Sequence, residues 1–309
     1  MIDFRSFREE HPELCPEDRL RIPGLGTQRT TEKAEVGDWE EAYKGVTRDD
    51  PWGDPPPVRK LMQASGAEAF GYYLSFRLDP ENWGIYMQGP PLVGLAREVV
   101  RVLDLGFPDL KERVPEEKAR EVAFSMAYDI ALNHLSLHAS LDAFAARYEV
   151  EDGDAYYAPY QEGPYGDSLT DMTGPDGYNW EEVLANLVSL RSFLNASQTV
   201  EFGARVDSYF NDEEKYRWNG FLMSGMLTSE LTYVMRPYPA SHKNFTEFLR
   251  RRGEVGPYAH MAIQYDLNTE AFHAGLQRLA ALLLRGREVQ EPEKGLLAPV
   301  NPPVYLTGE

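Results

Sequence analysis

Tyr128 to Tyr148 reads YDIALNHLSLHASLDAFAARY, and this stretch predicts a long amphipathic helix at the centre of the protein. It contains neither proline nor glycine, and its apolar residues recur at helical spacing. His134 and His138 are four positions apart, so they lie one turn apart on one face. That spacing lets two neutral imidazole nitrogens reach one tetrahedral metal ion. Asp142 continues the same stripe by another turn.

A second predicted helix bears on the meaning of the two histidines. Histidines at this spacing also occur as core or boundary residues that are satisfied by hydrogen bonds, so the pair alone does not indicate a metal. The segment from Trp180 to Phe193 is also helical in pattern and carries Glu182 one turn before Asn186. A carboxylate on a nearby helix favours the metal interpretation.

Together, the two helices resemble the gluzincin arrangement of zinc metallopeptidases. In that arrangement H-E-x-x-H lies on one helix, and a ligand glutamate lies on a later helix with Asp or Asn one turn on. More narrowly, the chain is similar to a bacterial family of minimal zincins with a Y-x-x-Y loop and a Glu-Glu-Ala-Leu-Ala-Asn helix. The counterparts here are His134 to His138, Tyr157 to Tyr160 and Glu181 to Asn186. The similarity extends over roughly residues 70 to 250.

The resemblance implies a fold, a cofactor and a ligand set. The fold would be α+β and predominantly helical, a zincin-like domain with a small β-sheet before the metal-binding helix. The cofactor would be Zn²⁺, held by His134, His138 and Glu182. Asn186 would support a ligand from outside the coordination shell, and Asp142 would buttress a ligand histidine. The substrate or partner would be a peptide or protein.

One departure from the family changes the expected activity. Leu135 stands where the family has the glutamate that activates the zinc-bound water. Peptide hydrolysis needs a base that takes a proton and delivers it to the leaving amine, and leucine does neither. Glu181 is a candidate replacement, although it points about 100° away from Glu182 around its helix. We therefore expect a degenerate or atypical metallopeptidase without the standard base.

The sequence also contains two candidate donors and is compatible with two other functions. Tyr238 and His242 are candidates for the electrophilic donor that gluzincins often supply from downstream. Metal-bound hydroxide attacks reactive esters without a carboxylate base, so a hydrolase of non-peptide substrates is a weaker alternative. The alternative from another class is a helical interaction or immunity-type protein that binds no metal. In that protein the histidines belong to the core, and an acidic surface serves a basic partner.

Composition excludes several classes of function. The 309 residues carry a formal net charge of −19, a field that repels nucleic-acid phosphates. No apolar stretch reaches the length of a membrane helix. The start of the chain lacks a basic region followed by an apolar run, which indicates a cytoplasmic protein. The single cysteine, Cys15, rules out an intramolecular disulfide framework.

Segments rich in proline and glycine divide the chain into three expected parts. We expect an irregular arm over residues 1–60, the zincin-like helical domain over 61–287, and an extended C-terminal tail over 288–309. Within the domain, two aromatic runs around Asp-Pro-Glu-Asn predict a β-hairpin. The second run, Trp83 to Gln88, is a candidate edge strand for pairing with an extended substrate, or an ordinary hairpin strand that covers a core.

The remaining elements follow from periodicity. Helices are expected over Pro91 to Leu105, from Pro115 to about Glu149, and at Leu276 to Leu284. The tyrosine-rich segment from Glu151 to Asn179 predicts a long loop. Its tyrosines either line a cleft or pack as amphipathic cover.

Overall fold

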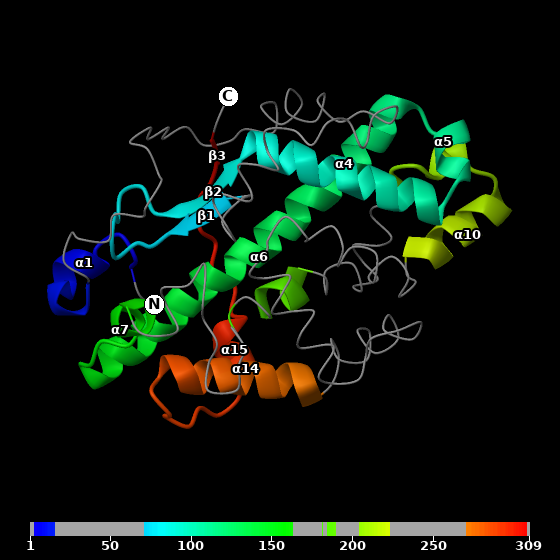
Figure 1. Cartoon of the computed structure of the whole chain (residues 1–309). Helices are drawn as coiled ribbons and strands as arrows, with labels where there is room; N and C mark the ends of the chain where they lie inside the picture. The colour runs from blue at the N-terminus through cyan, green and yellow to red at the C-terminus, as the bar shows by residue number, and fades with distance from the viewer. Residues whose placement is uncertain are drawn as a thin grey trace.

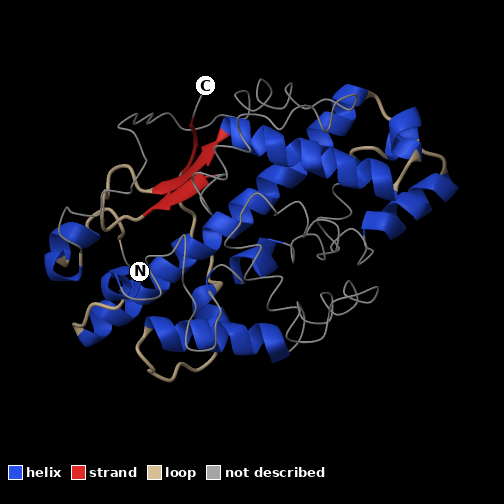
Figure 2. Cartoon of the chain, viewed as in Figure 1, coloured by secondary structure: helices blue, strands red, loops and turns tan. Residues whose placement is uncertain are grey.

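The computed structural model describes residues 3–15, 71–162, 181, 184–189, 204–222 and 270–307. In these segments the protein is mostly helical, with a small three-stranded mixed sheet beside one long helix (Figure 1, Figure 2). This confirms the predicted α+β class with predominantly helical content. The elements, in chain order, are α1 (Phe7–Glu10), η1 (Pro12–Leu14), β1 (Gly71–Leu74), β2 (Gly84–Gln88), α4 (Gly89–Gly106), α5 (Asp109–Arg113), α6 (Glu116–Asp152), α7 (Tyr157–Glu162), η3 (Asp207–Tyr209), α10 (Asp212–Leu222), α14 (Glu270–Leu283), α15 (Pro292–Leu296) and β3 (Val304–Thr307).

The long helix is α6, which confirms the helix predicted from Pro115 to about Glu149. Its 37 residues span about 55 Å at the usual rise of a helix. Pro115 is its N-cap, and two glutamates in the first turn favour the positive end of the helix dipole. Gly153 ends it in a left-handed conformation, with φ of +71°, and donates its N–H to the carbonyl of Glu149.

The middle of α6 is enclosed rather than amphipathic. Every residue from Ala139 to Ala146 is buried, because α6 packs against α4, the sheet, α7 and α15 (Figure 1). A helix that is covered on all sides has no solvent-facing stripe. Enclosure is therefore a property of the packed molecule, and the spacing of apolar residues along the chain does not reveal it.

The sheet has strand order β1-β2-β3, and one prediction about it is wrong. β1 and β2 form the predicted antiparallel hairpin, with Tyr72 opposite Tyr86. β3 comes from the C-terminal end of the chain and pairs parallel to β2 on its other side. β2 is therefore the central strand and has no edge for an extended substrate. Its first residue, Gly84, has φ of +148°, and a Cβ there would lie 2.4 Å from the carbonyl oxygen of Pro303.

The C-terminal segment, predicted as an extended tail, instead contributes structure to the main body. Within 288–309 the chain forms the helix α15, which packs on α6 and α14, and then the strand β3. Periodicity gave no sign of this, since a four-residue strand is defined by its partner rather than by its own pattern.

The N-terminal residues that the structure describes also dock on the main body. Phe7 and Leu14 are buried with Phe76 and with Ala146 of α6 in a small second cluster. Arg8 donates to the carbonyl oxygens of Arg77 and Leu78, which follow β1. The rest of the predicted irregular arm lies outside the described residues.

The main core lies between α6, α4 and the inner face of the sheet. Ile85 and Met87 of β2 point into it and are fully buried. In the described part of the chain, no helix combines the length and the apolar character that a membrane span requires.

Candidate functional site

The two histidines lie as the sequence predicts, one turn apart on one face of α6. Their ring centroids are 5.2 Å apart, and the ring planes meet at 61°. His134 is buried, whereas the side chain of His138 keeps 17% of its surface exposed. The pair therefore has one member in the core and one at its boundary.

Glu181 approaches His138, the histidine at the boundary of the core, from the second predicted helix. Its Oε1 lies 2.5 Å from Nδ1 of His138, and its Oε2 accepts a hydrogen bond of 2.8 Å from the hydroxyl of Tyr160. An ionised carboxylate only accepts hydrogen bonds, so this contact favours the tautomer with the proton on Nδ1. In that tautomer the lone pair is on Nε2, the nitrogen that can coordinate a metal.

The second helix is confirmed where the structure describes it, at residue 181 and over 184–189. Leu184, Ala185 and Asn186 are buried, so this segment packs into the main core beside α6. Glu182, Tyr238 and His242 lie outside the described residues. Within the described ranges, no group of three or more histidine, cysteine, aspartate or glutamate side chains is placed to hold a metal ion. The ligand set therefore stays a prediction.

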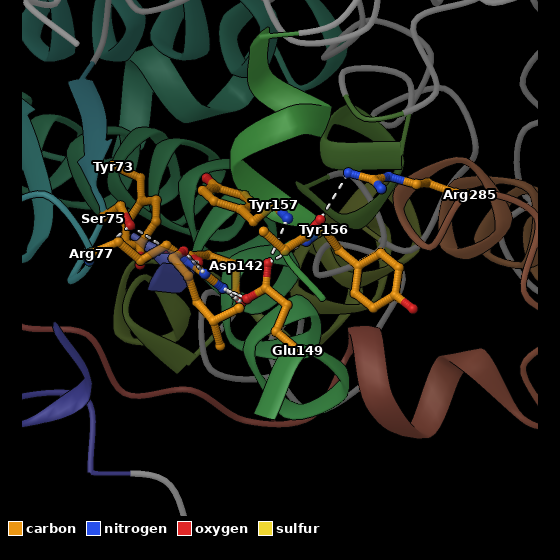
Figure 3. Close-up of polar contacts among 10 residues, drawn as sticks. Tyr73, Ser75, Arg77, Asp142, Glu149, Tyr156, Tyr157 and Arg285 are labelled. Atoms are coloured by element: carbon orange, nitrogen blue, oxygen red, sulfur yellow. Dashed lines mark hydrogen bonds and ion pairs between the residues drawn. The ribbon is translucent and has the colours of Figure 1, made fainter. Parts of the chain in front are cut away.

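Asp142, predicted to support a ligand histidine, is placed in a buried ionic cluster (Figure 3). Its Oδ1 lies 2.5 Å from Nε of Arg77. Its Oδ2 accepts hydrogen bonds from the hydroxyls of Ser75, at 2.5 Å, and Tyr73, at 3.0 Å. These donors come from β1 and the residues just after it, so Asp142 joins the sheet to α6.

Arg77 is the centre of this cluster. Its NH2 group lies 2.5 Å from Oε2 of Glu149, and both side chains are fully buried. Its NH1 group donates to the carbonyl of Leu14, and its guanidinium lies about 5 Å from three aromatic rings. Burial lowers the pKa of Arg77, but the charges of Asp142 and Glu149 outweigh it and hold the pKa above its ordinary value. Nothing in the sequence distinguishes this arginine from the other arginines of the chain.

Glu149 also fixes the start of α7. Its Oε1 accepts the backbone N–H groups of Tyr156, at 2.6 Å, and Tyr157, at 2.7 Å (Figure 3). The Y-x-x-Y segment is thus helical, although the sequence predicts a loop there. A glutamate seven residues upstream satisfies the first N–H groups of this helix. Tyr157 is buried, and burial raises its pKa well above the usual range, as does the charge of Asp142.

Leu135 occupies the position of the missing base and belongs to the core. It is 2% exposed and packs against β1. A Cβ built on Gly71 would lie 2.9 Å from Cδ1 of Leu135, so the strand approaches the helix closely at this point. This position is filled by apolar packing between α6 and the sheet.

Comparisons of the chain with models of protein families, with curated proteins and with solved structures give no match.

Proposed function

We propose that this chain is a zincin-like zinc-binding protein of the gluzincin type that lacks the peptidase base. What supports this best is the hydrogen bond between Glu181 and Nδ1 of His138. Histidines that coordinate a metal usually donate their other ring N–H to a carboxylate, which fixes the tautomer and the ring orientation. That arrangement exists here at the histidine for which the sequence predicts coordination.

The assignment of roles changes in one respect from the family pattern. Glu181 already accepts bonds through both oxygens, from His138 and Tyr160, so it acts as the orienting carboxylate rather than as a base. The ligands in this proposal are His134, His138 through Nε2, and Glu182. Zinc, when bound, polarises a coordinated water or carbonyl and lowers the pKa of that water.

The chain's own residues argue against efficient peptide hydrolysis. Leu135 neither accepts nor donates a proton, and its side chain packs against β1. Asp142, one turn beyond His138, has both oxygens engaged by Arg77, Ser75 and Tyr73. We therefore propose that the domain keeps a zinc ion for binding a peptide or protein partner and that its hydrolytic activity is lost or much reduced.

One observation favours the alternative, a helical interaction protein without metal. His134 is 1% exposed, and His138 already has a carboxylate partner in Glu181, which also accepts a hydrogen bond from Tyr160. A buried histidine beside one that pairs with a carboxylate is compatible with a purely structural role.

The metal content of the protein distinguishes the zinc-binding protein from the metal-free interaction protein. Protein purified without a histidine tag and incubated with zinc should contain about one zinc ion per chain, as a single tetrahedral site requires. Plasma mass spectrometry measures this content. The variant His134→Ala should lose the ion. The matched control is His273→Ala, since His273 is a half-exposed histidine on α14. No zinc in the wild-type protein, or equal zinc in both variants, contradicts the proposal.

A further inference from the structure

We infer that Glu149, held by Arg77, orients the imidazole ring of His138 for binding a metal ion. The effect passes through helix α7, Tyr160 and Glu181. The metal in this inference rests on the proposed zinc function. The orientation and tautomer of His138 do not, because they follow from protein contacts alone.

The first step is the anchoring of α7. One oxygen of Glu149 accepts the N–H groups of Tyr156 and Tyr157, and the other is paired with Arg77 (Figure 3). These five atoms are in the interior, where charge-assisted hydrogen bonds are stronger than in water. The carboxylate thus fixes both the position and the direction of the first turn of α7.

The second step is the placement of Tyr160. It is three residues beyond Tyr157, so α7 carries it one turn further on, and its side chain is nearly buried. Its hydroxyl donates to Oε2 of Glu181 while Oε1 faces His138. A carboxylate with a donor on each oxygen does not rotate without losing one of its bonds. The plane of Glu181, and with it the ring of His138, is therefore set by the position of α7.

The third step is that these contacts form a closed loop on α6. His138, Asp142 and Glu149 all belong to that helix, and Arg77 bridges the last two. The distance between the anchor at Glu149 and the histidine is thus fixed by a single rigid helix. A ring held in advance loses less conformational entropy when a ligand binds. This gives the buried cluster a positioning role for His138 in addition to its part in stability.

The tautomer of His138 in metal-free protein tests the inference directly. Long-range proton–nitrogen NMR spectra of ¹⁵N-histidine-labelled protein, at a pH where the imidazole is neutral, distinguish Nδ1–H from Nε2–H. We expect the wild-type ring to be Nδ1–H. Tyr160→Phe removes one hydroxyl, and Glu149→Asp keeps the charge beside Arg77 but withdraws the oxygen from the N–H groups of α7. Both variants should show a mixture of tautomers in folded protein, as judged by circular dichroism.

Tyr156→Phe is the matched control. It removes a hydroxyl from the neighbouring residue, whose partner is Asp152 rather than Glu181, so it should leave the tautomer unchanged. An Nε2–H ring in the wild type overturns the inference. An unchanged spectrum in Glu149→Asp also overturns it, because Glu149 would then have no influence on His138. An unchanged spectrum in Tyr160→Phe overturns it as well, because α7 would then not act on His138 through Tyr160.

Zinc titrations of the same variants separate this inference from the proposed function. Loss of an outer-shell partner typically weakens metal affinity 10- to 100-fold, and we expect about tenfold for Tyr160→Phe and no change for Tyr156→Phe. A wild-type protein that binds no zinc but shows the expected tautomers contradicts only the proposed function. A tenfold loss of affinity without a change of tautomer contradicts the positioning route.

Discussion

His138 and Leu135 lie within one turn of each other on α6 and show how differently two neighbouring residues are used. His138 is at the boundary of the core and shares a hydrogen bond with Glu181 of a distant segment. Leu135 is buried against the close approach of β1. Replacing Leu135 with the glutamate of the family would therefore place a carboxylate among apolar groups.

We expect Leu135→Glu to destabilise the protein without giving a peptidase. An unpaired buried carboxylate should reduce the free energy of unfolding by about 3 kcal/mol or more. Leu135→Met keeps the volume apolar and should lose less than about 1.5 kcal/mol. Urea denaturation measures both, and hydrolysis of casein measures activity. A Leu135→Glu protein with wild-type stability and new hydrolysis would show that this position is open to the site.

Among the elements, β1, α6 and α7 are joined by one buried cation and two buried carboxylates. Arg77 follows β1, while Asp142 and Glu149 belong to α6 and lie two turns apart (Figure 3). Removing one partner of a buried ionic group leaves an uncompensated charge in the interior, which is more costly than removing the whole group.

Removing Arg77 alone should therefore cost more stability than removing all three charges of the cluster. Arg77→Met should lose about 3–5 kcal/mol of stability in chemical denaturation, because both carboxylates remain. The triple variant Arg77→Met, Asp142→Asn, Glu149→Gln should be more stable than Arg77→Met alone. Arg217→Met is the control, since Arg217 is half-exposed and its ion pair with Asp109 should be worth about 1 kcal/mol or less. If the triple variant is no more stable than Arg77→Met, the uncompensated buried charge is not the cause of the stability lost in Arg77→Met.

At the scale of the whole molecule, two tyrosines beside Asp142, the partly buried Tyr73 and the buried Tyr157, predict how stability depends on pH. Burial, followed by the charge of Asp142, raises the pKa of Tyr73 and of Tyr157 well above the ordinary value of 10.0. A group whose folded pKa is raised contributes stability that is complete below its unfolded pKa and is lost as pH rises toward the folded value. Stability should therefore fall above about pH 10, by about 1.4 kcal/mol per pH unit for each such tyrosine.

Chemical denaturation between about pH 8 and about pH 11 measures this slope. Tyr157→Phe should make the decline shallower. Tyr216→Phe should not, because Tyr216 on α10 is 81% exposed. An identical slope in Tyr157→Phe and the wild type would contradict the contribution of the buried phenol.

The sequence alone determined the elements whose residues carry their own pattern. The helices α4, α6 and α14 follow from apolar spacing and from proline and glycine at their ends, and the β1–β2 hairpin follows from two β-prone runs around a turn. The spacing of His134 and His138 likewise placed both on one face of α6. These features depend on neighbours within a few residues along the chain.

Only the tertiary structure decided the features that depend on distant partners. β3 joins the sheet some 216 positions after the end of β2 and makes β2 central, which removed its predicted edge. α7 forms where a loop was expected because Glu149 binds its first N–H groups. Asp142 pairs with Arg77, and Glu181 pairs with His138. In each case the partners are far apart in the sequence, so periodicity does not relate them. They meet because a buried charge needs an opposite charge and a backbone N–H group needs an acceptor.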